Sequence, residues 1–186
     1  MRKKDILCLA ACAALVLPGA PARGGDDAGT RDQCAAVRKA GRKVVLYATE
    51  VDPANGMPSA WGAEPPIDDR IHGMITVYFH GARIGAARRF DAGLSGDWIK
   101  TQDYCFRSDG SLAFLKAELR TLRGGVRVED RMAFDMTGSR RRADRIVRDL
   151  ETDQDVANLN VTFTDQATAV YTDTRALRDA LGDALQ

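Results

Sequence analysis

Residues 126–136 read VRVEDRMAFDM, and apolar and polar side chains alternate along this stretch. One side of the period holds five apolar residues and one acid: Val126, Val128, Asp130, Met132, Phe134 and Met136. A two-residue period is typical of a β-strand that buries one face. The stretch therefore predicts a fold built on an antiparallel sheet, in which one face of each strand is covered.

Glycine turns flank this strand and repeat along the chain. The segment 106–111 (FRSDGS) recurs as 134–139 (FDMTGS), and 79–81 (FHG) is a shorter version upstream. In each copy an aromatic residue closes a strand shortly before a glycine, which adopts the positive φ of tight turns at little cost. The repeat predicts successive hairpins.

Further strands are expected on both sides of this stretch, at 43–50, 74–79, 84–90, 98–106, 112–122 and 141–150. The last is ambiguous, because Ala143, Ile146, Val147 and Leu150 have the spacing of an amphipathic helix. We predict a strand for 141–150, because the first two glycine turns also lead into strands. A short hairpin from 161–163 and 168–171 is also expected.

Two helices are predicted at the ends of this β region. A short one covers Arg31 to Lys39, with Cys34 and Val37 on one face, and Gly41 ends it. A second begins at Thr174 and is capped by Thr172 or Asp173. Its apolar face consists of Leu177, Ala180, Leu181, Ala184 and Leu185.

These elements define an α+β fold, namely an antiparallel β-meander with a short N-terminal helix and a C-terminal amphipathic helix packed on the sheet. Residues 52–69 contain four prolines and are predicted to be one long loop. The expected organisation is a signal peptide at 1–22, a flexible leader at 23–30 and a single globular domain at 31–186.

The N-terminus has the pattern of a secretory signal peptide. Arg2, Lys3 and Lys4 precede an apolar run at 6–17, and Ala20-Pro21-Ala22 supplies the small residues that signal peptidase requires. The run is shorter than the roughly 20 residues of a membrane-spanning helix. We expect a periplasmic or secreted protein without a transmembrane anchor.

A second interpretation of the N-terminus stays open. Residues 9–12 (LAAC) match the pattern at which bacterial lipoproteins are cleaved and acylated, here on Cys12. Cleavage there would leave a hydrophobic region shorter than the usual 7 to about 15 residues. Mass spectrometry of the mature N-terminus distinguishes the two cleavage sites.

Removal of the signal peptide leaves two of the four cysteines, Cys34 and Cys105. In an oxidising compartment they are expected to form a disulfide. Two separate buried thiols are the alternative. The cleavage also leaves 24 Lys and Arg against 25 Asp and Glu. A nearly neutral chain has no electrostatic footprint for nucleic acid.

Four residues are weak candidates for a binding site. Trp61 lies in the proline-rich loop, where it either forms a binding surface or pins the loop to the core. Asp130 lies on the apolar side of its strand and must be paired there, with an arginine for example, and Arg131 follows it. His72 lies near two aspartates, but so few ligands are clustered that we expect no metal site.

Catalytic and cofactor-binding motifs are missing from the sequence: no nucleophile elbow, phosphate-binding loop, zinc-protease helix or dinucleotide fingerprint occurs. We therefore expect no cofactor and name no catalytic residue.

The stretch 98–149 resembles small exported bacterial proteins of uncharacterised function, in which aromatic-x-Phe strands are closed by glycine turns. The matching segments are 104–106 with Asp109-Gly110, then 112–114, then 131–134 with Gly138. Cys105 and Ala133 stand where such proteins often have a second aromatic residue. The resemblance implies an exported β protein and carries no activity.

The expected function is that of an exported binding or accessory module for a protein or small molecule of the cell envelope, rather than an enzyme. An envelope hydrolase that uses scattered carboxylates such as Glu129 and Asp130 is one alternative. An inhibitor of an exported enzyme is another.

Overall fold

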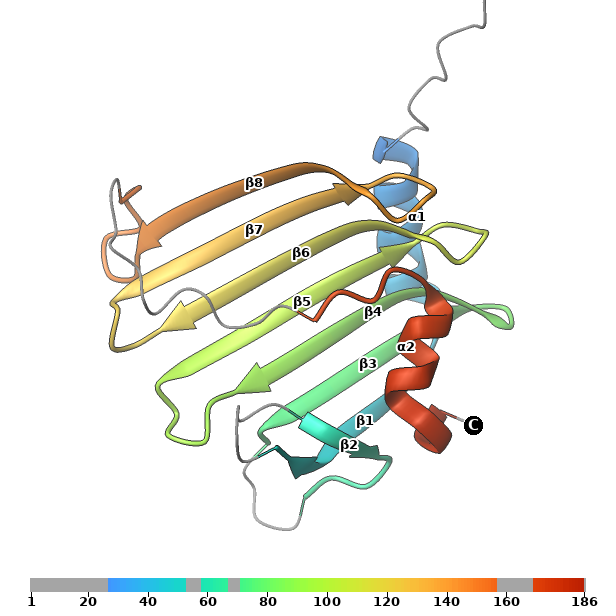
Figure 1. Cartoon of the computed structure of the whole chain (residues 1–186), viewed down its shortest axis with the longest axis horizontal. Helices are drawn as coiled ribbons and strands as arrows, with labels where there is room; N and C mark the ends of the chain where they lie inside the picture. Colours follow the sequence, from blue (N-terminus) through green and yellow to red (C-terminus); the bar gives the residue numbers. More distant parts are fainter. Residues whose placement is uncertain (1–26, 53–57, 67–70, 157–168, 186) are drawn as a thin grey trace, which may run out of the picture.

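The computed structural model describes residues 27–52, 58–66, 71–156 and 169–185. Eight strands form one antiparallel sheet in the order β2-β1-β3-β4-β5-β6-β7-β8, with a helix on each face (Figure 1). The strands are β1 (Arg42–Val51), β2 (Pro58–Gly62), β3 (Gly73–His80), β4 (Arg83–Ala92), β5 (Trp98–Phe106), β6 (Leu112–Thr121), β7 (Val126–Phe134) and β8 (Arg140–Asp149). The predicted α+β meander is confirmed. The predicted signal peptide lies outside the described residues.

The glycine turns have the conformation that the repeat predicted. Gly81, Gly110 and Gly138 all have positive φ, at 61°, 89° and 80°. The turns at 107–111 and 135–139 are closed by the same hydrogen bond. The N–H of Arg107 donates to the carbonyl of Ser111, and the N–H of Asp135 donates to the carbonyl of Ser139, both at 2.9 Å. The repeated sequence therefore encodes a repeated hairpin turn.

The ambiguous segment 141–150 forms strand β8, which pairs with β7 from Val126–Asp149 to Phe134–Arg140. Ala143 lies opposite Met132 and Val147 opposite Val128, so the apolar residues of β8 extend the apolar side of β7. Ile146 lies on the other face, opposite Glu129. Pairing with an already alternating strand thus overrides the helical spacing.

The prediction that 52–69 is a loop throughout is wrong. Residues 58–62 form β2, which pairs with the end of β1, for example Ala48 with Trp61. The unpaired edge of β1 supplies the hydrogen-bonding partner, which the proline content of the segment does not reveal. A proline at the start of an edge strand is tolerated, because no ladder bond needs its missing N–H.

Three other boundaries are corrected. Helix α1 (Asp27–Ala40) starts inside the segment predicted to be a flexible leader. Helix α2 (Thr174–Leu181) is capped by Asp173 but ends earlier than expected, because Gly182 has a positive φ of 57° and a 3-10 turn η1 (Gly182–Leu185) follows. Of the predicted 161–171 hairpin, residues 161–168 lie outside the described residues, and 169–171 are not strand.

The strand register defines two faces of the sheet. One cross-strand row on the first face, here called the open face, consists of Val45, Thr76, Arg88, Asp103, Lys116, Arg131 and Asp144. The adjacent row on the second face, here called the covered face, consists of Leu46, Ile75, Arg89, Gln102, Ala117, Asp130 and Arg145. Helices α1 and α2 lie on opposite sides of the sheet (Figure 1).

The main core lies between the covered face and α2. Leu177 and Leu181 of α2 pack with aliphatic and aromatic side chains of β1 and β3 to β7, namely Leu46, Ile75, Val77, Phe79, Ile84, Ala87, Tyr104, Phe106, Leu112, Leu115 and Phe134. Helix α1 crosses one end of the open face, where the disulfide Cys34–Cys105 joins it to β5. Gly85 lets the helix approach β4, since a Cβ there would lie 3.1 Å from Val37.

Candidate functional site

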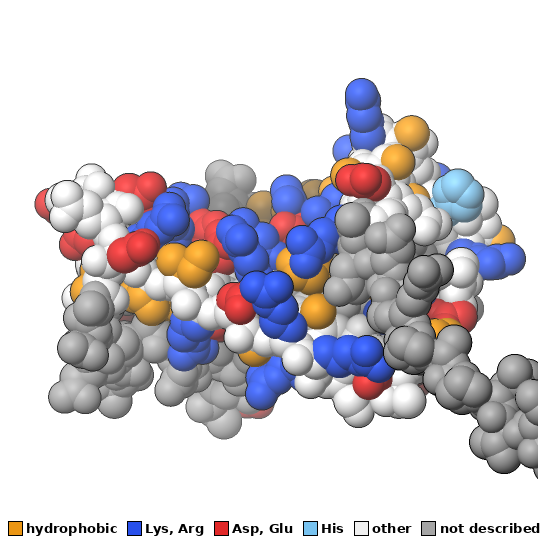
Figure 2. Space-filling view, turned by 90° about the horizontal axis from the view of Figure 1, so that it is seen from above, with side chains coloured by type: hydrophobic (Ala, Val, Ile, Leu, Met, Phe, Trp, Pro, Cys, Tyr) orange, Lys and Arg blue, Asp and Glu red, His pale blue; other side chains and the backbone are white. Residues whose placement is uncertain are grey.

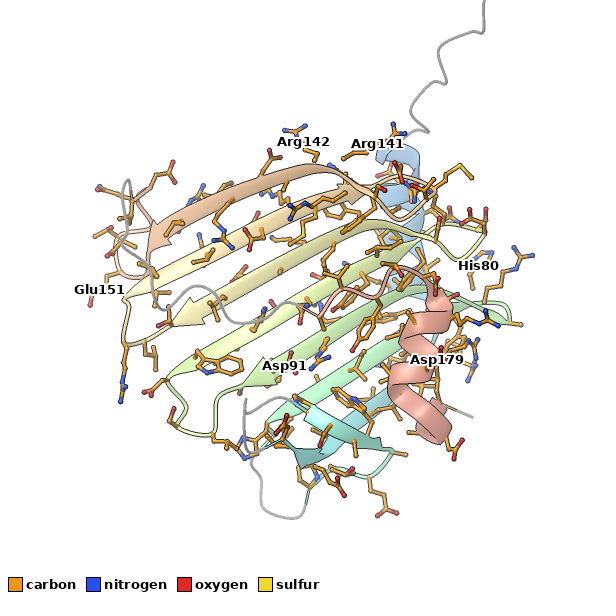
Figure 3. All side chains as sticks on the ribbon, viewed as in Figure 1. His80, Asp91, Arg141, Arg142, Glu151 and Asp179 are labelled. Carbon is orange, nitrogen blue, oxygen red and sulfur yellow. A yellow bond between two sulfur atoms is a disulfide. The ribbon has the colours of Figure 1, made fainter. Side chains whose placement is uncertain are left out.

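A buried charged cluster lies on the covered face, at β4 and β5. Arg89, Asp91 and Lys100 are 4%, 0% and 2% exposed, although each carries an ionisable side chain. The Arg89 Nε donates to both Asp91 carboxylate oxygens, at 3.0 and 2.9 Å. Lys100 lies directly opposite Asp91 across the two strands. Figure 3 shows Asp91 within the sheet, away from the arginines of the β8 edge.

The segment before α2 is tied to this cluster by its hydrogen bonds. Arg89 Nη1 donates to the Tyr171 hydroxyl at 2.6 Å. The carbonyl of Ala169 accepts from the Tyr104 hydroxyl at 2.6 Å and from Gln102 Nε2 at 2.9 Å. These bonds join residues 65 to 82 positions apart in the sequence, so the cluster fixes the C-terminal segment to the centre of the sheet.

Burial changes the proton affinities in the cluster. It lowers the pKa of Lys100 to about 8, against the opposing attraction of Asp91. It also raises the pKa of Asp91, although the Arg89 guanidinium works in the other direction. Both pKa shifts show that burial disfavours the charged form of the side chain, as desolvation does. The cluster therefore costs folding energy that its ion pair and hydrogen bonds must offset.

The pH dependence of stability tests this environment of Lys100. The pKa of Lys100 falls from 10.5 to about 8 on folding, so the unfolded chain binds more protons between these two values. The unfolding free energy of the wild type should therefore rise relative to Lys100→Met, by about 2 kcal/mol from about pH 7.5 to about pH 9.5. Urea denaturation at the two pH values measures it, and parallel pH profiles of the two proteins would show that Lys100 is not desolvated.

The cluster is closed in this structure. Its three charged residues are at most 4% exposed, and the carbonyl of Ala169 accepts hydrogen bonds from Gln102 and Tyr104. A ligand would have to displace the C-terminal segment to reach the Arg89 guanidinium, which is bonded to Tyr171. The arrangement is that of an anchor for this segment.

The open face is accessible over β1 and β3 to β8. Its half on β1, β3 and β4 carries partly exposed apolar and aromatic side chains, namely Val45, Tyr47, Met74, Tyr78 and Phe90. Its half on β5 to β8, together with Arg88 of β4, carries charged side chains in cross-strand rows and is here called the charged half. Among the described elements, α1 packs on this face, at one end of β3 to β6.

On the charged half, the carboxylate side chains are more buried than the arginine side chains that pair with them. The side chains of Asp103, Glu118 and Glu129 are 18%, 20% and 15% exposed. The arginines that pair with them, Arg88, Arg120 and Arg131, are 50%, 56% and 50% exposed. The outermost groups of this surface are consequently guanidinium groups.

A hollow of about 380 Å³ lies on the charged half, lined by Arg88, Ile99, Thr101, Asp103, Lys116, Glu118 and Arg120. A smaller one of about 50 Å³ follows on β7 and β8, lined by Arg127, Glu129, Arg131, Ile146 and Arg148. Figure 2 looks onto the β8 edge and shows Lys and Arg side chains gathered along the middle of the molecule. The open face therefore combines shallow hollows with exposed cations.

The residues singled out in the sequence do not form one site. Trp61 packs against the core and stacks on Arg89, whose guanidinium carbon lies 5.3 Å from the ring centroid. Asp130 accepts two hydrogen bonds from Arg145, at 2.7 and 2.9 Å, on the same covered face. Arg131 lies on the open face and pairs with Glu129. His72 precedes β3, and its carbonyl accepts from the N–H of Ala92.

The sequence did not reveal the cluster of Arg89, Asp91 and Lys100. Arg88 and Arg89 are adjacent and point to opposite faces, so the pattern of β4 gives no sign of which one is buried. The one available indication is that Arg89 and Asp91 share the side of Ala87 in an alternating strand.

The described part of the chain contains neither a cluster of metal ligands nor a helix that could cross a membrane. There, His, Cys, Asp and Glu side chains form no group of three that could hold a metal ion. None of the helices described is long and apolar enough to cross a membrane.

The fold and these two sites define an α+β protein with a single antiparallel meander, one face of which packs against a C-terminal helix and the segment before it, while the other is largely exposed. No family model matches the chain, and no curated protein or solved structure matches it.

Proposed function

We propose that this protein is an exported binding module that docks a protein partner on its open face. The observation that carries the proposal is the composition of that face, where an apolar and aromatic half adjoins an arginine-rich half with shallow hollows. Aromatic residues, methionine and arginine are the types enriched at protein interfaces. Export rests on the N-terminal pattern, and the disulfide is consistent with it.

The alternative of a hydrolase with scattered carboxylates gains no support from the geometry. Glu129 lies on the open face, opposite Glu118, whereas Asp130 lies on the covered face, opposite Ala117. The sheet separates the two carboxylates, so they cannot act on one substrate. Asp130 is also engaged by Arg145 through both oxygens.

The proline-rich segment is a less suitable docking element than the open face. Trp61 stacks on Arg89 and packs against the core, so its ring pins β2 to the covered face. This is the structural role that the sequence left open beside a binding role.

Site-specific photo-crosslinking in the producing cells tests the proposal. A photoreactive residue at Ile99, which is 42% exposed in the larger hollow, should give a discrete adduct with a protein partner. The same residue at Asp179, exposed on α2 on the other side of the sheet (Figure 3), is the matched control and should not give it. Equal adducts from both positions, or none from Ile99, would contradict docking on the open face.

A further inference from the structure

Three arginines form a row across the outer strands of the open face. Arg120 on β6 lies directly opposite Arg127 on β7, which lies directly opposite Arg148 on β8. Neighbouring strands are about 4.8 Å apart, so the three side chains start at closely spaced points. Like charges directly opposite each other destabilise a sheet. The row is therefore a costly arrangement that needs carboxylates to offset it.

The compensating carboxylates on the strands themselves are few and lie low. Glu118 accepts from Arg120 at 2.8 Å. Glu129 lies in the same row as Glu118, beside the arginine row, and pairs with Lys116 and Arg131. Glu118 and Glu129 are also directly opposite each other, as are Lys116 and Arg131. Charge thus alternates by rows along β6 and β7, and the arginine row is the last of these rows, next to the turn at 122–125.

The hairpin tip that follows β8 supplies two further carboxylates. Asp153 pairs with Arg127 and with Arg148, and Asp155 pairs with Arg148 at 3.1 Å. These two aspartate side chains are 61% and 80% exposed, unlike the low-lying acids of the strands. Asp153 has a φ of 56°, a conformation that only a few residue types adopt readily. Solvent-exposed carboxylates of this kind exchange easily with others, because exposed ion pairs are weak.

We infer that the row of Arg120, Arg127 and Arg148 binds a carboxylate-rich segment of a protein partner. In the free protein, Asp153 and Asp155 form ion pairs with two of these arginines, Arg127 and Arg148. The inference rests on the proposed function, since it assigns a chemistry to the partner of the open face. Guanidinium groups bind carboxylates through paired hydrogen bonds, so a partner segment with several acids on one side can bind the row through its long, flexible side chains.

Fluorescence anisotropy with a labelled peptide of alternating Glu and Ser, and a Gln and Ser counterpart as reference, tests the inference. The variant Arg120→Gln/Arg127→Gln/Arg148→Gln should bind the acidic peptide about tenfold more weakly than the wild type. The variant Asp153→Asn/Asp155→Asn should bind it several-fold more tightly, because it removes the internal competitor. Asn suits position 153, since it tolerates positive φ as Asp does.

The control for lost charge is Arg175→Gln/Arg178→Gln, which removes two exposed cations of α2, against three in the row variant, and should leave binding unchanged. Raising the salt concentration should weaken binding to the wild type, as expected for exposed charges. Equal losses from the two arginine variants would overturn the inference, because net charge rather than the row would then decide. Binding to phosphatidylglycerol vesicles without binding to the peptide would overturn it in favour of a membrane surface.

The crosslinking at Ile99 separates this inference from the proposed function. An unchanged urea midpoint shows that the triple arginine variant keeps its fold. If this variant still gives the adduct at Ile99, docking on the open face is supported and the proposed role of the arginine row is wrong. If the wild type gives no adduct at Ile99, the proposed function itself fails, whatever the peptide binds.

Discussion

Replacing Asp91 by Asn should lower the free energy of unfolding by about 3 to 5 kcal/mol. The carboxylate is fully buried and accepts two hydrogen bonds from Arg89, while Lys100 lies opposite it. Without its charge, the Arg89 guanidinium and the Lys100 ammonium remain in a desolvated environment with one fewer counter-ion. Urea denaturation of the wild type and the variant at neutral pH measures the difference.

The chain contains a matched control for this effect. Asp130 also accepts two hydrogen bonds from an arginine, Arg145, but that guanidinium side chain is 49% exposed. Asp130→Asn should therefore cost no more than about 1 kcal/mol. A combined Arg89→Met/Asp91→Leu variant should be closer in stability to the wild type than Asp91→Asn, since apolar residues can replace a buried pair. Equal costs for Asp91→Asn and Asp130→Asn would show that burial does not dominate.

Removing the disulfide should have an effect of similar size. Cys34 and Cys105 are 71 positions apart, and closing a loop of this length stabilises a protein by about 4 kcal/mol in the chain-entropy model. The variant Cys34→Ala/Cys105→Ala should lose this amount, because its unfolded chain regains the conformational entropy that the closed loop removes. In the folded variant, contacts such as that of Val37 with Gly85 still hold α1 on the sheet. The urea midpoint of the variant measures the loss.

Reductant provides the control for the disulfide prediction. It should lower the urea midpoint of the wild type towards that of the double variant and leave the double variant unchanged. Both cysteines are almost fully buried, at 4% and 2% exposure, so reduction is expected to be slow in the native state. A double variant as stable as the oxidised wild type would contradict a stabilising role.

The strands were predictable because they are determined by residues that are near each other in the chain. Residues 98–106 form β5 as expected, and 112–121 form β6 despite a composition that also suits a helix. The glycine turns set the lengths of these strands, and Gly96, Gly110 and Gly125 have the positive φ that such turns require. The strand β2 was missed although β1 directly precedes it in the chain and pairs with it from Val51–Pro58 to Tyr47–Gly62, because the prolines of 52–69 favour a loop.

The candidate site was predictable only in part. Asp130 was expected to need an arginine, and Arg145 provides it, but the sequence named no partner. The cluster of Arg89, Asp91 and Lys100 depends on Tyr171, which is 82 positions from Arg89. The arginine row depends on the register of three strands at once, and a shift of one residue in any of them would send its arginine to the covered face.

The sequence by itself determined the class of fold. The two-residue period and the glycine turns depend only on residues that are near each other in the chain, and the two cysteines form a covalent bond. Only the tertiary structure decided which face of the sheet is covered. Charged residues occur on both sides of β4 and β5, so their period does not distinguish the buried Arg89 from the exposed Arg88. That distinction arises because α2 and the segment before it pack on one face, a contact between parts of the chain far apart in sequence.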